Sequence, residues 1–139
     1  EGASPNALLE SFKSTERAVL LGTRSFWEGV DVPGDSLSVV VITKLPFDVP
    51  SDPIISARSE LYEDPFNEYY LPESILKFRQ GFGRLIRTAS DRGVVAILDR
   101  RVLTKQYGRM FLESLPQCTA RQGPVAGLAK MAGQWLGTL

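Results

Sequence analysis

The sequence predicts an α/β domain in which helices pack against a mostly parallel β-sheet. Three short apolar runs carry this prediction: residues 18–22, residues 37–43 and residues 93–99. Unbroken runs of this kind are typical of strands that are buried on both faces, as in a parallel sheet. Helical patterns lie between and after the runs, and strands that alternate with helices indicate a layered α/β sandwich. A length of 139 residues is that of a single domain.

The first half of the chain is predicted to hold a capped helix and two strands. The tripeptide Ser4-Pro5-Asn6 precedes the segment ALLESFK, and a capping residue followed by proline is a helix start signal. The run AVLLG (18–22) is the first predicted strand, and LSVVVIT (37–43), rich in β-branched residues, is the second. A proline-rich loop follows from Leu45 to Pro53.

From residue 53 onward the chain is predicted to be mostly helical. The run GVVAILD (93–99) is the third strand, and residues 118–120 are a candidate fourth. Four helices are predicted, over residues 53–63, 72–88, 102–114 and 124–136.

Composition narrows the classes of function. The chain has no histidine and one cysteine, Cys118, which excludes an internal disulfide and a cysteine cluster for a metal ion. Histidine is also the usual general base of catalysis. No apolar run approaches the roughly 20 residues that cross a bilayer, and no basic-then-apolar segment suggests secretion. We therefore expect a reduced, cytoplasmic setting and no membrane partner.

The net charge is zero at pH 7, but its distribution is uneven. Residues 1–76 hold 5 basic and 13 acidic residues, whereas residues 77–139 hold 11 basic and 3 acidic residues. Nine of the basic residues fall between Lys77 and Arg109. This asymmetry predicts a cationic face for an anionic partner. The alternative is a set of salt bridges between the two halves.

The helix predicted over 72–88 contains the stretch RQGFGRLIR, in which two glycines stand among three arginines. On a helical wheel one face is polar and holds Gln80, Gly83, Arg84 and Arg87. The opposite face is apolar and is expected to point to the core; it comprises Ile75, Phe78, Phe82, Leu85 and Ile86. Gly83 lets a bulky partner approach the backbone, and two guanidiniums beside such a gap suit a phosphate group. The alternative is an ordinary solvated face on which Gly83 admits a neighbouring helix.

A second candidate segment, GTRSFWEGVDVPG (22–34), follows the first predicted strand. The carboxyl end of a strand is where ligands bind in open α/β sheets. The segment offers hydroxyls and carboxylates around a glycine, namely Thr23, Ser25, Glu28, Gly29 and Asp31. Hydroxyls and backbone amides can hold nucleic-acid phosphates, and a carboxylate can accept a hydrogen bond from a ribose hydroxyl. The alternative is a loop with a buried tryptophan anchor and a solvated turn.

Together the two segments resemble motifs V and VI of superfamily 2 helicases. The stretches SFWEGVDVPG, KLPFDVPSDP and LPESILKFRQGFGRLIR, followed by DRGVVAILDRR, resemble the bacterial DinG branch of the DinG/XPD-type ATP-dependent DNA helicases. The resemblance runs in order from about Asn6 to Leu115 without evident gaps. Because it includes the segments between the motifs, it is far more specific than either motif alone.

The resemblance implies a fold and a function. Members of this family are ATP-driven translocases on single-stranded DNA, generally of 5′-to-3′ polarity, with two RecA-like domains. The chain is then expected to be the second RecA-like domain, a three-layer sandwich of the P-loop NTPase type. ATP and Mg²⁺ would be bound mainly by the first RecA-like domain, and the partners would be that domain and single-stranded DNA. The chain alone is expected to be inactive.

The resemblance also assigns roles within motif VI. Arg87 is expected to be the arginine finger, with Arg84 beside it, and the two supply positive charge to the ATP phosphates. Gln80 is expected to position the γ-phosphate or the attacking water. Gly83 would clear room for the contents of the cleft, and Gly81 would permit tight packing.

Within motif V, the resemblance implies a link between nucleotide and DNA. Glu28, Gly29 and Asp31 would couple the nucleotide state to DNA contact, with Asp31 nearer the nucleotide. Thr23 and Ser25 would lie closer to the DNA backbone.

The motifs that bind most of the nucleotide are not in the chain. It contains no G-x-x-x-x-G-K-[ST] phosphate loop and no D-E-x-H segment for the magnesium ion. The iron–sulfur cluster of many family members would need four cysteines in the absent first half. Motif IV and the first strand of the domain are expected upstream of Glu1, which favours a fragment or a truncated product of a longer protein.

Two other functions stay open from the sequence. A stand-alone nucleic-acid-binding or regulatory module without ATPase activity would also lack the phosphate loop. A different nucleoside-triphosphate enzyme of RecA-like fold, such as a subunit of a nucleotide-dependent nuclease, is disfavoured by the helicase-like wording of residues 44–53. Some DinG-like proteins carry a fused exonuclease domain, and these residues do not decide whether one is present.

Overall fold

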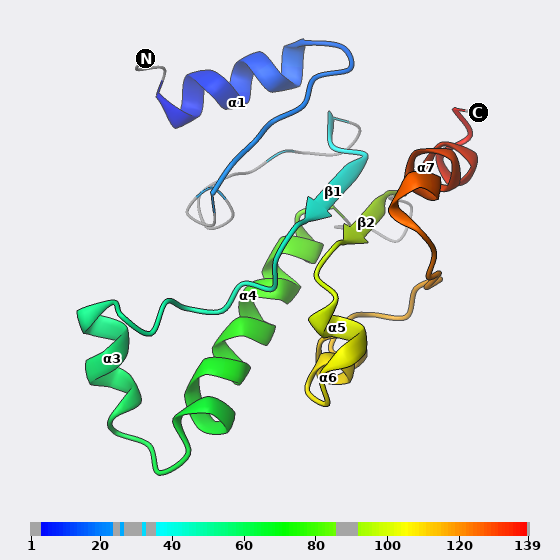
Figure 1. Cartoon of the computed structure of the whole chain (residues 1–139). Helices are drawn as coiled ribbons and strands as arrows, with labels where there is room; N and C mark the ends of the chain where they lie inside the picture. Colours follow the sequence, from blue (N-terminus) through cyan, green and yellow to red (C-terminus); the bar gives the residue numbers. More distant parts are fainter. Residues whose placement is uncertain (1–3, 24–25, 27–31, 33–35, 86–91, 139) are drawn as a thin grey trace.

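The chain folds as a small parallel sheet with helices around it (Figure 1). The computed structural model describes residues 4–23, 26, 32, 36–85 and 92–138. The elements in chain order are α1 (Pro5–Ser14), β1 (Val39–Ile42), α3 (Pro53–Ser59), the π-helix η2 (Phe66–Tyr70), α4 (Leu71–Gly83), β2 (Val94–Ile97), α5 (Arg101–Thr104), α6 (Gly108–Glu113), the 3-10 helix η3 (Val125–Gly127) and α7 (Leu128–Leu136). The mixed α/β class predicted from the sequence is confirmed.

The two strands of the sheet run parallel. Val39 lies opposite Val94, and Ile42 lies opposite Ile97. A parallel pair needs a long crossover connection, and here the crossover contains α3, η2 and α4. Both arrows in Figure 1 point the same way, so the loops that follow the two strands begin at the same edge of the sheet.

A cluster of apolar side chains joins α4 and α6 to the carboxyl end of β1. It comprises Ile42, Leu45, Leu71, Phe78, Val102 and Phe111. Phe78 and Phe111 are fully buried, and their rings meet edge to face with centroids 5.3 Å apart. This arrangement is favourable because the positive edge of one ring meets the negative face of the other. The ring of Phe47, in the loop after β1, extends the cluster by contacts with Tyr107 and Phe111.

Caps start the helices that the sequence predicts near Ser4 and residue 53. The Ser4 hydroxyl accepts a hydrogen bond from the Ala7 N–H at 3.2 Å. The Asp52 carboxylate accepts from the Ile54 and Ile55 N–H groups at 2.9 and 3.2 Å. Both helices begin with proline, which lacks an N–H that would have no partner at this position.

Two predicted strands do not form among the described residues, so these predictions are wrong. Residues 18–22 and residues 118–120 are irregular, and Val19 and Leu21 are 84% and 88% exposed. A strand is stable only when its N–H and C=O groups pair with a neighbour, and in the described part of the chain neither segment has such a ladder. An apolar run shows that a segment has side chains typical of a strand. It does not identify the neighbouring segment with which the backbone would pair.

The helix predicted over 102–114 is two short helices, α5 and α6. Gly108 begins α6, and a Cβ at this position would lie 2.3 Å from the carbonyl oxygen of Val102. The break itself lies at Lys105, whose extended backbone (φ −102°, ψ 144°) ends α5 before α6 begins. The helix predicted over 53–63 forms as α3 and ends at Ser59.

The other two predicted helices form with shifted boundaries. The helix predicted over 72–88 is α4, which begins at Leu71 and ends at Gly83, and residues 86–88 lie outside the described residues. The helix predicted over 124–136 begins as η3 and continues as α7. It ends at Gly137, whose φ of 74° is the left-handed conformation that glycine adopts at helix ends.

Asp99 connects the ends of the two strands. Its carboxylate accepts from the N–H of Leu45, in the loop after β1, at 2.8 Å and from the N–H of Arg101 at 3.0 Å. The Arg101 guanidinium donates to Asp99 as well, at 2.6 Å from Nη2, and lies 5.4 Å from the centre of the Phe47 ring. Hydrogen bonds from the Arg101 side chain, and then from these N–H groups, hold the pKa of Asp99 well below its usual range.

Ser74 on α4 provides a test of how the core is packed. It is 1% exposed, and among the described residues its hydroxyl has no hydrogen-bond partner. A buried unsatisfied hydroxyl costs about 1–3 kcal/mol, so we expect Ser74→Ala to leave the free energy of unfolding unchanged or to raise it, measured by urea unfolding. Phe78→Ala, the control, should lower it by about 3–5 kcal/mol. A clear loss of stability in Ser74→Ala would show that the hydroxyl has a partner.

The lowered pKa of Asp99 predicts a pH-dependent contribution to stability. The unfolded chain binds this proton more readily than the folded chain, so the contribution is present at neutral pH and is lost as the pH falls. We expect Asp99→Asn to lower the free energy of unfolding at about pH 7 and to flatten its decline below about pH 5. Urea unfolding across this pH range measures both. Glu113→Gln, in an exposed pair with Arg109, is the control, and equal pH profiles for Asp99→Asn and the unaltered chain would contradict the prediction.

Candidate functional site

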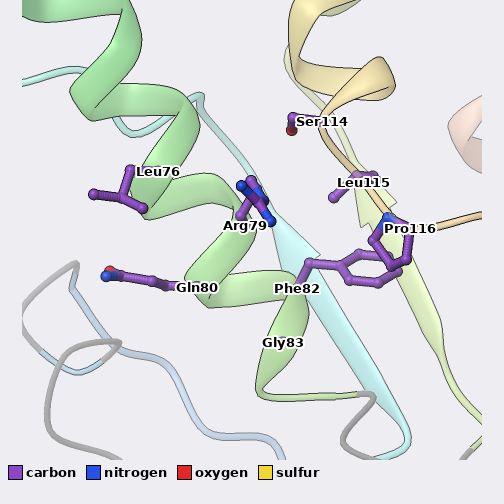
Figure 2. Close-up of a pocket in the computed structure, with 8 residues that line it drawn as sticks. All are labelled: Leu76, Arg79, Gln80, Phe82, Gly83, Ser114, Leu115 and Pro116. Atoms are coloured by element: carbon purple, nitrogen blue, oxygen red, sulfur yellow. The ribbon is translucent and has the colours of Figure 1, made fainter. Parts of the chain in front are cut away.

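One face of α4 is polar, and among the residues that the structure describes it is largely exposed; Gln80 and Gly83 lie on it (Figure 2). Gln80 and Gly83 are exposed, and Arg84, which follows the last residue of the helix, is half-buried. The opposite face is buried and comprises Phe78, Phe82 and Leu85. The division into two faces that the helical wheel predicts is therefore confirmed for the described residues.

The two glycines of α4 stand in different surroundings. Gly81 is buried. A Cβ on Gly83 would have nothing within 4 Å, and Gly83 is not among the glycines with positive φ. Neither packing nor backbone conformation within the described residues requires a glycine at position 83. The described part of the chain also supplies no helix for which Gly83 would make room.

Gln80 lies between two shallow hollows. The larger, of about 630 Å³, lies between α4 and the end of α6 and is lined by Leu76, Arg79, Gln80, Phe82, Gly83, Ser114, Leu115 and Pro116. In Figure 2 Arg79 lies on the side of α4 that faces Ser114 and Leu115, whereas Gln80 extends to the other side. The second, of about 330 Å³, is formed by Glu73, Leu76, Lys77, Gln80 and Arg84. The polar face is thus accessible from both sides of Gln80.

An ion pair anchors this part of α4 to the loop after β1. The Lys77 ammonium lies 2.7 Å from both carboxylate oxygens of Asp48. The side chains are 15% and 2% exposed respectively, so the pair is largely withdrawn from water. Lys77 precedes Gln80 by one turn of α4 and contributes to the same hollow as Gln80 and Arg84.

The last turn of α4 is wound more tightly than the rest. The Arg84 N–H donates to the Gly81 carbonyl at 3.3 Å, and the Leu85 N–H donates to the Phe82 carbonyl at 3.0 Å. Bonds over three residues are typical of 3-10 winding at a helix end. Arg84, as the residue after the last residue of α4, lies in this tighter turn.

Several predicted site residues lie outside the described residues. These are Arg87 of motif VI and Ser25, Glu28, Gly29 and Asp31 of motif V. Thr23 is described: it is exposed, and its carbonyl accepts from the Phe26 N–H at 2.9 Å. The structure thus brings Gln80, Gly83 and Arg84 together on one face. It gives no distance between that face and the segment at 23–31.

Sequence reasoning did not name Asp48 or Lys77 as site residues. The position of Lys77 carried a signal, because it precedes Gln80 by three residues and Arg84 by seven and so shares their face. No such signal marks Asp48, which lies 29 residues from Lys77 in the sequence. The pairing depends on how the loop after β1 folds back over α4.

Two further findings concern only the residues that the structure describes. No group of three or more His, Cys, Asp or Glu side chains among them is arranged to hold a metal ion. None of their helices has the length and apolar character that crossing a bilayer requires.

Comparison with known proteins identifies the family. Residues 1–118 match the family described as "Helicase C-terminal domain". The chain is 51% identical over 119 residues to the Bacillus subtilis (strain 168) protein "3'-5' exonuclease DinG", covering 83% of the chain and 13% of that protein. It is 51% identical over 117 residues to "ATP-dependent DNA helicase YoaA" of Escherichia coli (strain K12), covering 81% of the chain and 18% of that protein. Identity to "ATP-dependent helicase DinG" of Mycobacterium tuberculosis (strain ATCC 25618 / H37Rv) is 44% over 117 residues, with the same coverage.

The family match includes the whole of α4 and both strands, since all three lie within residues 1–118. The chain spans only 13–18% of the length of these relatives. The family match nevertheless covers most of the chain. About half of the aligned residues are identical in the Bacillus subtilis and Escherichia coli relatives. The chain therefore belongs to the helicase C-terminal domain family and corresponds to the C-terminal region of the DinG/YoaA-type ATP-dependent DNA helicases.

Proposed function

We propose that this chain acts as the second RecA-like domain of a DinG-type ATP-dependent DNA helicase of 5′-to-3′ polarity. In this role α4 delivers positive charge to ATP bound against a first RecA-like domain. The polar face of α4 carries the proposal, because Gln80, Gly83 and Arg84 lie on it with the spacing of motif VI. The names of the Escherichia coli and Mycobacterium tuberculosis relatives, both ATP-dependent helicases, support the same activity.

The small sheet supports a RecA-like three-layer sandwich as the fold of the whole domain. β1, the helical crossover and β2 form a parallel strand–helix–strand unit, the repeated unit of such sandwiches. Both strands end at the edge where ligands bind in this class of fold. The described residues form one such unit of the proposed sandwich.

Charge stabilisation is the chemistry that the polar face of α4 would supply. During phosphoryl transfer, negative charge is spread over the oxygens of the γ-phosphate. Arg87 would act as the arginine finger with Arg84 beside it, since a planar guanidinium can donate two hydrogen bonds to one phosphate. The Gln80 amide would orient the γ-phosphate or the attacking water. The open space at Gly83 would let the phosphate approach the helix backbone.

We expect the metal ions of the family to be held mainly by the first RecA-like domain. Mg²⁺ would arrive with ATP and neutralise phosphate charge from the first domain, and the residues described here contain no metal-binding cluster. An iron–sulfur cluster does not fit this chain, because its one cysteine is Cys118 and such clusters take four. The chain alone, without a phosphate loop, should therefore not hydrolyse ATP.

The segment at 22–31 would connect the nucleotide to DNA. Glu28, Gly29 and Asp31 would respond to the nucleotide, with Asp31 nearer to it. The hydroxyls of Thr23 and Ser25 would contact phosphates of single-stranded DNA.

A stand-alone nucleic-acid-binding or regulatory module without ATPase activity is the second candidate. The basic stretch from Lys77 to Arg109 favours it, because Arg79, Arg100 and Lys105 are exposed and exposed cations bind nucleic-acid backbones without ATP. ATP turnover by the full-length protein separates the two functions.

Substitution of Arg87 tests the arginine-finger role. In the full-length protein we expect Arg87→Ala to lower kcat for ATP hydrolysis by about 10³–10⁵ while changing KM little. Arg87→Lys should not restore the rate, because an ammonium cannot make the bidentate contact. Arg109→Ala, which removes an exposed arginine paired with Glu113, is the control and should keep the full rate. A rate restored by Arg87→Lys would contradict bidentate phosphate recognition.

Substitution of Thr23 and Ser25 tests the DNA contact. In the full-length protein we expect the double variant Thr23→Ala, Ser25→Ala to weaken single-stranded DNA binding and to lose DNA stimulation of ATP hydrolysis. Basal hydrolysis should stay the same, because the nucleotide contacts are elsewhere. Affinity as a function of salt concentration measures the loss of phosphate contacts.

The matched control for this double variant is Ser14→Ala, Thr15→Ala, which removes two exposed hydroxyls at the end of α1. If Thr23 and Ser25 only cap the turn, their double variant will melt at a lower temperature and bind DNA as before. That outcome would refute the DNA contact.

A further inference from the structure

The ion pair between Lys77 and Asp48 is unusual for its burial. Both oxygens of Asp48 lie 2.7 Å from the Lys77 ammonium, and the Asp48 side chain is 2% exposed. Taking two charges out of water costs free energy that their attraction often fails to recover, so a buried pair is weak evidence for stability. A role in specifying geometry is better attested for such pairs.

The geometry that this pair specifies is the rotation of α4 about its own axis. Phe78 holds the opposite face of the helix by packing against Phe111, and apolar packing is not directional. The pair between Lys77 and Asp48 is directional, because one ammonium donates to both oxygens of a carboxylate. The pair connects α4 to the loop that follows β1. It therefore helps to fix the orientation of the helix relative to the sheet.

The residues that depend on this rotation lie immediately after Lys77. Gln80 and Arg84 follow it by three and seven residues, and all three line the same hollow. Side chains of a helix reach about 5 Å from its axis, so a rotation of about 20° moves them by about 2 Å. A misplacement of about 1 Å can cost about a hundredfold in rate.

We propose that Lys77 and Asp48 are positioning residues for ATP hydrolysis. Their ion pair holds α4 at the rotation in which Gln80 and Arg84 face the γ-phosphate. This inference rests on the proposed function of α4 and adds to it two residues outside the Gln80–Gly83–Arg84–Arg87 set, neither of which touches the reacting atoms.

The test replaces the pair by apolar side chains of similar size. In the full-length protein, Lys77→Met with Asp48→Leu removes both charges together, and such replacements often leave stability unchanged. We expect kcat for ATP hydrolysis to fall by about tenfold to a hundredfold, KM for ATP to stay within about threefold, and the melting temperature to change little. A purely structural pair predicts the opposite: unchanged kcat per folded molecule whatever the melting temperature.

A second variant keeps the test decisive if the double variant folds poorly. Lys77→Gln removes the positive charge and shortens the side chain by one atom, whereas Lys77→Arg keeps the charge and can donate to both oxygens of Asp48. With rates normalised to the folded fraction, we expect Lys77→Gln to lose at least about tenfold in kcat and Lys77→Arg to recover most of it. Equal kcat values in the unaltered protein, the Lys77→Gln variant and the Lys77→Arg variant would overturn the proposal.

The exposed pair of Lys13 and Glu10 on α1 is the matched control. Lys13→Met with Glu10→Leu should leave kcat and KM unchanged. Arg87→Ala, measured alongside, separates the two hypotheses: if it leaves kcat unchanged, the proposed function of α4 fails. If it lowers kcat while the Lys77 and Asp48 variants do not, only the positioning role fails.

Discussion

Phe78 is fully buried against Phe111, and this contact turns one side of α4 to the core, although it does not by itself fix the exact rotation of the helix. Once Phe78 points into the core, helical geometry turns Gln80 and Gly83 to the outside. Among the described residues nothing lies within 4 Å of where a Cβ on Gly83 would be, so this position adds nothing to the packing of that part of the chain. The free energy that holds the helix therefore comes from one face, and the opposite face is available for a ligand.

Hydrogen bonds and ion pairs near the carboxyl ends of the strands fix orientations that apolar packing alone does not fix. Asp99 joins the end of β2 to the N–H of Leu45 after β1, and Asp48, a few residues further on, reaches Lys77 on α4. The loop after β1 is thus tied at two points, once to the other strand and once to the helix. A segment tied in this way can hold α4 in one orientation relative to the sheet. Nucleotide chemistry at Gln80 and Arg84 would require such an orientation.

Local patterns predicted much of this architecture, and long-range partners account for the rest. The apolar face around Phe78 and Phe82 and the two strands are encoded by short-range patterns of apolar residues. The sequence was therefore sufficient to predict them. The run at 18–22 has the side chains of a strand, but its pairing depends on another backbone segment that periodicity cannot identify. The spacing of Gln80, Gly83 and Arg84 left an ordinary solvated face open, and only the resemblance over the longer stretch indicated motif VI. The contact of Lys77 with Asp48 spans 29 residues and follows only from the folded loop.

The most direct measurement of the central claim is the structure of the full-length protein with ADP and aluminium fluoride, a mimic of the transferring phosphate. We expect the polar face of α4 to line the nucleotide cleft. The guanidinium of Arg84 or Arg87 should then lie within about 3 Å of the fluoride ligands. A structure in which the mimic is bound elsewhere and this face of α4 contacts only solvent or DNA would contradict it.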